Sequence, residues 1–183
     1  MRYVVAIDVG VVNLGICVFD FRTSKIVFWD NVSLTKGGRY RPTENVKYVR
    51  DFVQKYEEFF EDALAVLVER QMRCNMRIIE AVLQTLYYER CHVIAPRSIK
   101  AHYKISGRSY AANKKLAVEW VAGFLDRNVS SFAEQAAATA EQFASMKKKR
   151  DDLADAMLLL LYYLDTYSNS MRVDIPDDDP IFH

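Results

Sequence analysis

Apolar residues occur along this chain first in short runs bounded by turn residues and later in longer stretches with helical spacing. Short runs bounded by Gly, Pro, Asn or Ser are typical of strands, whereas apolar residues that recur every three or four positions indicate helices. We expect strands at residues 3–9, 14–21, 25–32, 64–68 and 92–95, and helices at 44–62, 74–90, 109–125, 131–146 and 152–167. The segment 97–109 is polar and basic, so we expect a loop there.

The order of these elements predicts an α/β protein in which a mixed five-stranded sheet carries helices on both faces. The first three strands are close enough in sequence to be antiparallel neighbours. A chain of 183 residues favours a single domain. We place this domain at 1–170 and expect an acidic tail at 171–183.

Composition argues for a folded protein of the cell interior. Hydrophobic residues make up 51% of the chain and aromatic residues 13%, which argues against disorder. The longest apolar run, 156–164, is too short to span a bilayer, and no signal peptide precedes the first strand. We therefore expect a soluble intracellular protein with no membrane partner and no small-molecule cofactor. A viral replication compartment, the mitochondrion and the cytoplasm fit this composition equally well.

Cysteine and histidine spacing does not indicate a zinc site. Cys17, Cys74 and Cys91 lie far apart in the sequence and are interpreted as reduced core residues. The three histidines are equally scattered.

Positive charge is concentrated in three segments although the net charge is only +1. Six lysines and arginines and no acid lie between 97 and 115, five basic residues lie between 33 and 50, and four adjoin one another at 147–150. Separated signs of charge predict a basic face that suits nucleic acid. For any single segment, ordinary solvated charge is an equally good interpretation.

Four acidic residues on buried elements are the candidate functional residues. Asp8 interrupts the near-continuous apolar run of the first strand, which is typical of a central strand buried on both faces. A carboxylate in such a place needs a partner, and a metal ion is one of the few adequate ones. Glu69 ends the fourth strand, and Asp152 and Asp155 open a very apolar helix.

Each acid also has an ordinary interpretation when it is taken alone. Glu69 can simply begin a loop, and Asp151 or Asp152 can cap a helix and suit its dipole. Asp151 shares a helix face with Asp155 as well as Asp152 does. The helix is apolar almost all round, however, so Asp155 must face something that balances its charge. Taken together, the acids indicate two hard cations that activate a water and stabilise the leaving oxygen of a phosphodiester.

Three motifs resemble the acidic tetrad of RuvC-like Holliday junction resolvases. They are Ile7-Asp8-Val9-Gly10 with Asn13 and Gly15, Val68-Glu69-Arg70-Gln71, and Asp152-Leu153-Ala154-Asp155-Ala156. The Glu-Arg-Gln form is most similar to the poxvirus-type and mitochondrial members. Segments 95–100 and 107–118 resemble the basic loop and helix start of the family, so the resemblance extends from Tyr3 to about Leu164.

The resemblance implies an RNase H-like fold of the retroviral integrase superfamily, a homodimer, and Mg²⁺-dependent nicking of four-way DNA junctions. It implies that the catalytic metal ligands are Asp8, Glu69, Asp152 and Asp155, with two Mg²⁺ ions per site that Mn²⁺ can replace. It thereby selects Asp152 over Asp151 as the third acid.

The resemblance also extends to basic residues. Lys115 matches a lysine that supports the catalytic site, with Lys114 a close second, and Lys100 matches a lysine that contacts DNA. The DNA-binding residues that we expect are Arg70, Arg73, Lys100, Lys104, Arg108, Lys114, Lys147, Lys148, Lys149 and Arg150. Met72 stands where bacterial members have an aromatic residue near the junction centre, so no sequence preference for cleavage carries over.

The expected helix at 74–90 is more apolar than one buried face requires. Arg77, Glu80 and Gln84 cluster in one narrow polar sector, and apolar residues fill most of the rest. A surface helix needs an apolar stripe of only about 100°. The second apolar side is therefore covered either by other helices of the same chain or by an isologous dimer partner. The interface residues that we expect in the second case are Cys74, Ile78, Ala81, Thr85 and Tyr88.

Three other functions are alternatives to junction resolution. An RNase H-type nuclease that acts on RNA–DNA hybrids or on other branched DNA fits the same motifs. A sugar kinase or actin-like ATPase also opens with Asp-Val-Gly after a first strand, but such proteins need two such domains and 183 residues are too few. A non-catalytic junction-binding protein would have no need of all four acids.

Overall fold

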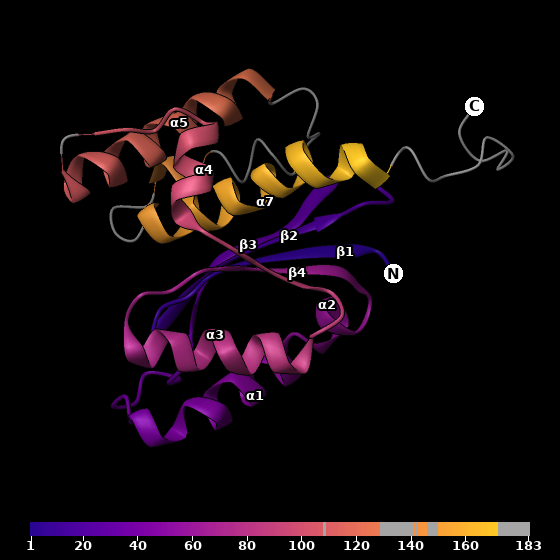
Figure 1. Ribbon diagram of the computed structural model, residues 1–183, viewed down its shortest axis with the longest axis vertical. Helices are drawn as coiled ribbons and strands as arrows, with labels where there is room; N and C mark the ends of the chain where they lie inside the picture. Colours follow the sequence, from indigo (N-terminus) through magenta and orange to yellow (C-terminus); the bar gives the residue numbers. More distant parts are fainter. Residues whose placement is uncertain (108, 129–140, 142, 146–149, 172–183) are drawn as a thin grey trace, which may run out of the picture.

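The computed structural model describes residues 1–107, 109–128, 141, 143–145 and 150–171 (Figure 1). Five strands form one sheet in the order β3-β2-β1-β4-β5. Their bounds are Tyr3–Asp8 for β1, Asn13–Asp20 for β2, Lys25–Ser33 for β3, Ala63–Glu69 for β4 and Cys91–Ile94 for β5. Strands β1, β2 and β3 pair antiparallel, while β4 runs parallel to both β1 and β5, which confirms the mixed sheet expected from the sequence.

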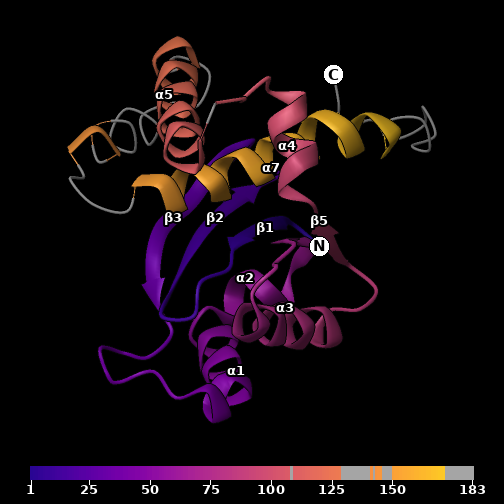
Figure 2. The same ribbon diagram turned by 60° about the vertical axis from the view of Figure 1, so that its left-hand side comes forward.

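Helices cover both faces of this sheet (Figures 1 and 2). One layer holds α1, α2 and α3, and the other holds α4, α5 and α7. The helices are α1 (Asn45–Lys55), α2 (Glu57–Glu61), α3 (Cys74–Leu86), α4 (Pro96–His102), α5 (Tyr110–Asn128) and α7 (Arg150–Met171), with a 3₁₀ turn at Pro42–Glu44. None of the described helices combines the length and the apolar character needed to cross a membrane.

Strand β1 contributes to two separate cores because its side chains alternate between the faces of the sheet. Val4 and Ala6 are buried toward α7, and Val5 and Ile7 are buried toward α1 and α3. All four are fully inaccessible to solvent. This two-sided burial is what the near-continuous apolar run predicted.

The start of helix α7 lies unusually close to strand β2. A Cβ atom at Gly15 would come within 2.2 Å of the Asp152 carbonyl oxygen, so only glycine permits this approach. Trp29 of β3 donates a hydrogen bond from its indole N–H to the Leu153 carbonyl oxygen at 3.0 Å. The sheet thereby sets the position of the helical turn that carries the two aspartates.

Three expectations about local structure were wrong or lie outside the described residues. The single helix expected at 44–62 is broken at Tyr56, whose φ of −115° and ψ of 28° separate α1 from α2. The loop expected at 97–109 contains the short helix α4, which buries only Ile99 and so has little apolar signal. Most of the helix expected at 131–146, and the tail expected at 171–183 apart from its first residue, lie outside the described residues.

Candidate active site

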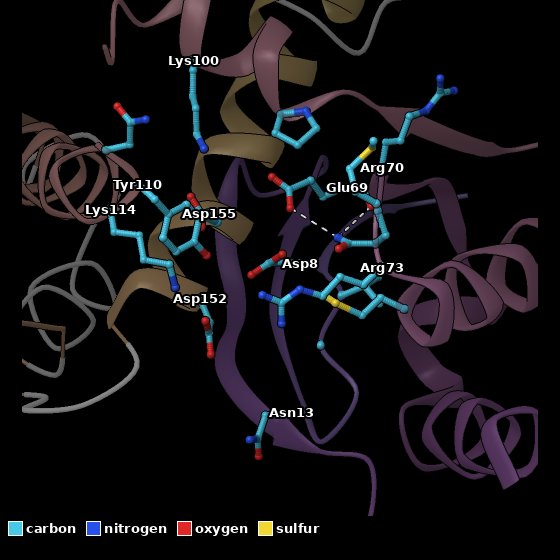
Figure 3. A pocket seen from close by; sticks show the side chains of 17 residues that line it. Asp8, Asn13, Glu69, Arg70, Arg73, Lys100, Tyr110, Lys114, Asp152 and Asp155 are labelled. Carbon is cyan, nitrogen blue, oxygen red and sulfur yellow. Dashed lines mark hydrogen bonds between the residues drawn. The ribbon is translucent and has the colours of Figure 1, made fainter. Parts of the chain in front are cut away.

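A cavity of about 370 Å³ opens where β1 and β4 end, and all four acids of the sequence motifs line it (Figure 3). We call it the site cavity. The residues that line it are Asp8, Val9, Gly10, Asn13, Glu69, Arg70, Gln71, Met72, Arg73, Met76, Pro96, Lys100, Tyr110, Asn113, Lys114, Asp152 and Asp155. The structure therefore brings together acids that are up to 147 positions apart, from 8 to 155.

Strand alternation directs the two sheet acids toward α7. Asp8 follows Ala6 by two positions and Glu69 follows Leu67 by two, and both Ala6 and Leu67 belong to the core beneath α7. Strands β1 and β4 are parallel neighbours, so their carboxyl ends meet at one edge of the sheet. Asp152 and Asp155 lie one turn apart on α7, so one helical face presents both to this edge.

Burial and mutual repulsion make these acids hard to ionise. Burial raises the pKa of Asp8 well above its ordinary value, and the nearby Glu69 and Asp155 raise it further. Burial also raises the pKa of Glu69, and the bond with Asp8 and the charge of Lys100 offset this effect only in part. The pKa of Asp155 is raised to about 7, first by burial and then by Glu69.

The donor set suits a hard divalent cation. Carboxylate oxygens are the ligands that such ions prefer. Three of these carboxyl groups are half-buried beside one another, and their raised pKa values mean that added positive charge would favour their ionisation. Among the residues that the structure describes, no three acid, histidine or cysteine side chains converge tightly enough to form a metal site as they stand. Figure 3 shows Asp8, Glu69 and Asp155 near one another and Asp152 farther along α7.

The raised pKa values lead to a stability prediction for the metal-free protein. Because Asp155 binds its proton more tightly in the folded state, stability should fall as pH rises from about 4 to about 7. One pKa unit corresponds to about 1.4 kcal/mol, so Asp155→Asn should stabilise the metal-free protein at pH 8 by roughly 2–4 kcal/mol. Thermal unfolding in EDTA measures this, and added Mg²⁺ should stabilise the wild type more than the variant.

Asp151 supplies the matched control on the same helix. Burial opposes its ionisation, but the bond from Lys114 outweighs burial and lowers the pKa of Asp151 below its usual value. Asp151→Asn should therefore destabilise the protein at pH 8, the opposite direction to Asp155→Asn. Equal unfolding temperatures for wild type and Asp155→Asn between pH 5 and 8 would contradict the assignment of a buried, repelled carboxylate.

Lys114, rather than Lys115, lines the site cavity. Its ammonium group forms an ion pair with Asp151 and lies 5.2 Å from the centre of the Tyr110 ring. Lys115 points elsewhere: its side chain is 78% exposed and it pairs with Glu119 at 3.5 Å. Adjacent helical positions face about 100° apart, so only one of the two lysines can line the cavity. The geometry favours Lys114 over Lys115 as the lysine that supports the site, and the role of either lysine stays a prediction.

Of the other expected DNA contacts, Arg70, Arg73 and Lys100 line the site cavity. Figure 3 shows the Arg70 side chain extending away from the acids, whereas Lys100 reaches toward Asp155. Lys104 is exposed and Arg150 is half-buried, and neither lines the cavity. Arg108, Lys147, Lys148 and Lys149 lie outside the described residues.

A second cavity, of about 360 Å³, collects basic residues of segment 33–50. Lys36, Arg39, Arg41 and Lys47 line it, together with Glu44 and Asp51. The segment leaves β3 at Ser33, which pairs with Asn13 beside the site cavity. These basic side chains therefore emerge from the same edge of the sheet as the acids.

Sequence reasoning assigned no role in the site to two polar residues behind Glu69, although Gln71 belongs to the Glu-Arg-Gln motif. Gln71 donates hydrogen bonds from its side-chain amide to the carbonyl oxygen of Glu69 at 3.1 Å and to its Oε2 at 3.3 Å. Glu80 accepts a 2.6 Å hydrogen bond from the Gln71 backbone N–H. The helical wheel placed Glu80 in the narrow polar sector of its helix, and in the structure it is only 8% exposed. Tyr110, 71% exposed at the cavity, was also missed and had no signal in the sequence.

Four of the five residues expected at a dimer interface lie on one open side of α3, and the fifth, Tyr88, lies in the turn that follows the helix. Cys74, Ile78, Ala81, Thr85 and Tyr88 are all exposed, with Ile78 39% and Tyr88 81% accessible. The opposite side of α3 buries Ile79 and Leu83 against the sheet. Helix α1 packs beside α3 and covers a further part of its surface. Helices of the same chain thus cover part of the apolar surplus, and an interface on the exposed side of α3 stays a prediction.

Comparison with known proteins finds one family whose model matches most of this chain. The model of the family described as poxvirus A22 protein matches residues 2–166. Among curated proteins, none matches the sequence.

Solved structures resemble the chain over most of its length. The yeast mitochondrial Holliday junction resolvase Ydc2 has a TM-score of 0.63 at 19% identity, over 94% of this chain and 86% of that one. The fowlpox virus resolvase in complex with Holliday junction DNA has a TM-score of 0.62 at 17% identity, over 89% and 97%. RuvC of Thermus thermophilus with its junction substrate has a TM-score of 0.52 at 14% identity, over 92% and 98%. The RNase H-like fold expected from the sequence is thereby confirmed.

Proposed function

This chain belongs to the poxvirus A22 protein family, and from that premise we propose that it is a structure-selective endodeoxyribonuclease that resolves four-way DNA junctions. The single observation that carries the proposal is the meeting of Asp8, Glu69, Asp152 and Asp155 in one cavity beside basic side chains. The solved structures that share the fold are named as Holliday junction resolvases or RuvC, and two of them contain junction DNA.

The acids are proposed to hold divalent metal, with two Mg²⁺ ions replaceable by Mn²⁺. When bound, such ions supply a nucleophilic water and stabilise the charge on the phosphate and the leaving oxygen. Proximity and raised pKa values favour Asp8, Glu69 and Asp155 as ligands. Asp152 completes the set after a change in its side-chain conformation. Lys100 and Lys114 add fixed positive charge at the same cavity.

The DNA backbone is proposed to lie across the edge of the sheet that holds both cavities. Arg73, Lys100 and Lys114 line the site cavity, and Lys36, Arg39, Arg41 and Lys47 line the second one. Cations along such a path neutralise phosphates and release counterions, so binding should weaken steeply with salt. Tyr110 offers an exposed ring for a sugar or an unstacked base.

A homodimer is proposed to form through the exposed side of α3. A four-way junction has near two-fold symmetry, and two strands must be nicked to resolve it. An isologous contact between two copies of α3 places two sites on one particle. Apolar Ile78, Ala81 and Tyr88 supply surface that water contacts unfavourably in the monomer.

The deciding experiment compares substrates under one condition. A synthetic four-way junction, a linear duplex and an RNA–DNA hybrid of matched sequence are incubated with the protein and Mg²⁺. Paired, symmetric nicks in the junction and little cleavage of the others are expected. Preferential cleavage of the hybrid would make the protein an RNase H-type nuclease instead, and tight junction binding without nicks in Mg²⁺ or Mn²⁺ would make it a binding protein.

The neighbouring lysines on α5 give a matched pair of variants. Lys114→Ala should slow nicking of bound junction roughly 10- to 100-fold, because it removes a cation that lines the site cavity beside the acids. Lys115→Ala should change the rate about twofold or less, since an exposed lysine paired with Glu119 contributes little. Single-turnover nicking at saturating protein measures the rate apart from affinity. A larger loss of nicking rate for Lys115→Ala than for Lys114→Ala would show that Lys115 supports the site.

A further inference from the structure

We propose that Glu80 is a positioning residue that holds the Glu69 carboxylate in place through Gln71. The inference rests on the proposed function only in taking Glu69 to be a metal ligand. It assigns a role to a buried acid on α3 that contributes no atom to the site cavity.

Glu80 is buried where a carboxylate is costly. Its side chain is 8% exposed, and among the described residues no lysine, arginine or histidine forms an ion pair with it. What it has is the 2.6 Å hydrogen bond from the Gln71 backbone N–H, a charge-assisted bond of the stronger kind. A buried acid whose partner is a loop N–H anchors that loop to its helix, since breaking the bond leaves both groups unsatisfied.

The Gln71 side chain connects the anchored loop to Glu69. It is 7% exposed, and its amide nitrogen reaches both the Glu69 carbonyl oxygen at 3.1 Å and Glu69 Oε2 at 3.3 Å. The first bond holds the amide against the end of β4, and the second orients the carboxylate (Figure 3). The Arg70 backbone N–H is tied to the Ile94 carbonyl oxygen at 2.8 Å on the other side. The turn 69–71 is thus fixed from β5 and from α3.

Orientation matters because Glu69 is long and flexible. A free glutamate loses side-chain entropy when it binds a metal, and a carboxylate already held by a hydrogen bond loses less. Removing such outer partners of a ligand typically lowers metal affinity by about 10- to 100-fold. Glu80 is one hydrogen bond further from the metal than Gln71 is. A similar loss of metal affinity is therefore expected only for variants that cannot accept the hydrogen bond from the Gln71 N–H.

The test uses isosteric variants and Mn²⁺ alone as the probe. Glu80→Gln retains an oxygen that accepts from the Gln71 N–H, whereas Glu80→Leu fills similar volume without one. Titration of the metal-free protein with Mn²⁺ should show affinity within about threefold of wild type for Glu80→Gln and roughly 10-fold weaker or more for Glu80→Leu. Gln71→Met should resemble Glu80→Leu, because it removes the donor that reaches Glu69.

A double-mutant cycle separates positioning from general damage. In a Glu69→Gln background the carboxylate to be oriented is gone, so Glu80→Leu should weaken Mn²⁺ binding by less than about twofold. An equal loss in both backgrounds would reduce Glu80 to a structural residue and overturn the inference. Hydrogen exchange of the Gln71 amide supplies a readout that needs no metal: it should be protected in wild type and in Glu80→Gln, and fast in Glu80→Leu.

The outcomes for the two proposals are distinct. A wild type that binds Mn²⁺ but does not nick junctions removes the proposed function and leaves the positioning role standing. A wild type that nicks junctions while Glu80→Leu keeps full Mn²⁺ affinity removes the positioning role alone. A wild type that binds no Mn²⁺ overturns the metal role and the positioning role together. Should Glu80→Leu not fold, Glu80→Met, which also lacks an oxygen to accept from the Gln71 N–H, carries the same test with and without Glu69→Gln.

Discussion

Asp155→Asn is expected to abolish junction nicking while junction binding stays intact or becomes tighter. The amide keeps the shape of the side chain but removes a negative charge from a cavity that three other acids share. Cleavage falls because a metal ligand is lost, and binding improves because repulsion between carboxylate and phosphate is smaller. Asp8→Asn, Glu69→Gln and Asp152→Asn should behave alike.

The loss should be large. Metal ions stabilise the transition state of phosphodiester cleavage by several kcal/mol, and each 1.36 kcal/mol is tenfold in rate, so a fall on the order of 10³-fold is expected. Nicking of a labelled four-way junction in Mg²⁺ measures the rate, and gel shift in Ca²⁺ measures binding, since Ca²⁺ should support binding with little cleavage.

Asp126→Asn is the matched control for Asp155→Asn. Asp126 is exposed near the end of α5 and does not line the site cavity, so its nicking rate should equal that of wild type. Nicking by Asp155→Asn at near the wild-type rate would remove Asp155 from the catalytic set.

Ile78→Glu is expected to convert the dimer into monomers that bind junctions poorly and do not make paired nicks. Ile78 is 39% exposed on the open side of α3, away from Ile79 and Leu83, so the change should spare the core. A charge buried without a partner in an interface costs several kcal/mol, so the dimer dissociation constant should rise by roughly 10²- to 10³-fold. Analytical ultracentrifugation and a supercoiled cruciform substrate measure assembly and coupled cleavage.

Gln84→Glu is the matched control on the same helix. It adds the same charge in the polar sector of α3, where the side chain is exposed, and should leave a dimer with paired nicking. A wild-type protein that sediments as a monomer at micromolar concentration and still makes paired nicks would show that the α3 interface is wrong. Ala81→Asp provides a second substitution on the open side if Ile78→Glu unfolds.

The positions of the two sheet acids could be predicted from local sequence patterns alone. A strand buried on both faces is almost wholly apolar, so a carboxylate at Asp8 stands out against it, and alternation along β1 and β4 sends Asp8 and Glu69 to the same face. The apolar helix α7 with acids in its first turns supplied the rest of the set. These are local rules of period two and 3.6, which need no knowledge of what packs against the element.

The side of α5 that lines the site cavity and the burial of Glu80 both result from tertiary packing. Lys114 and Lys115 are neighbours on α5, and no local pattern shows which of them faces the sheet. The packing of α5 against α7 turns Lys114 toward Asp151. On a helical wheel Glu80 lies in the polar sector of α3, and this position does not indicate burial. Its hydrogen-bond partner is the Gln71 backbone N–H, nine residues earlier, and the position of that group depends on where β4 and β5 end. Contacts between elements depend on the geometry of both, and such geometry leaves no periodic trace in either stretch of sequence.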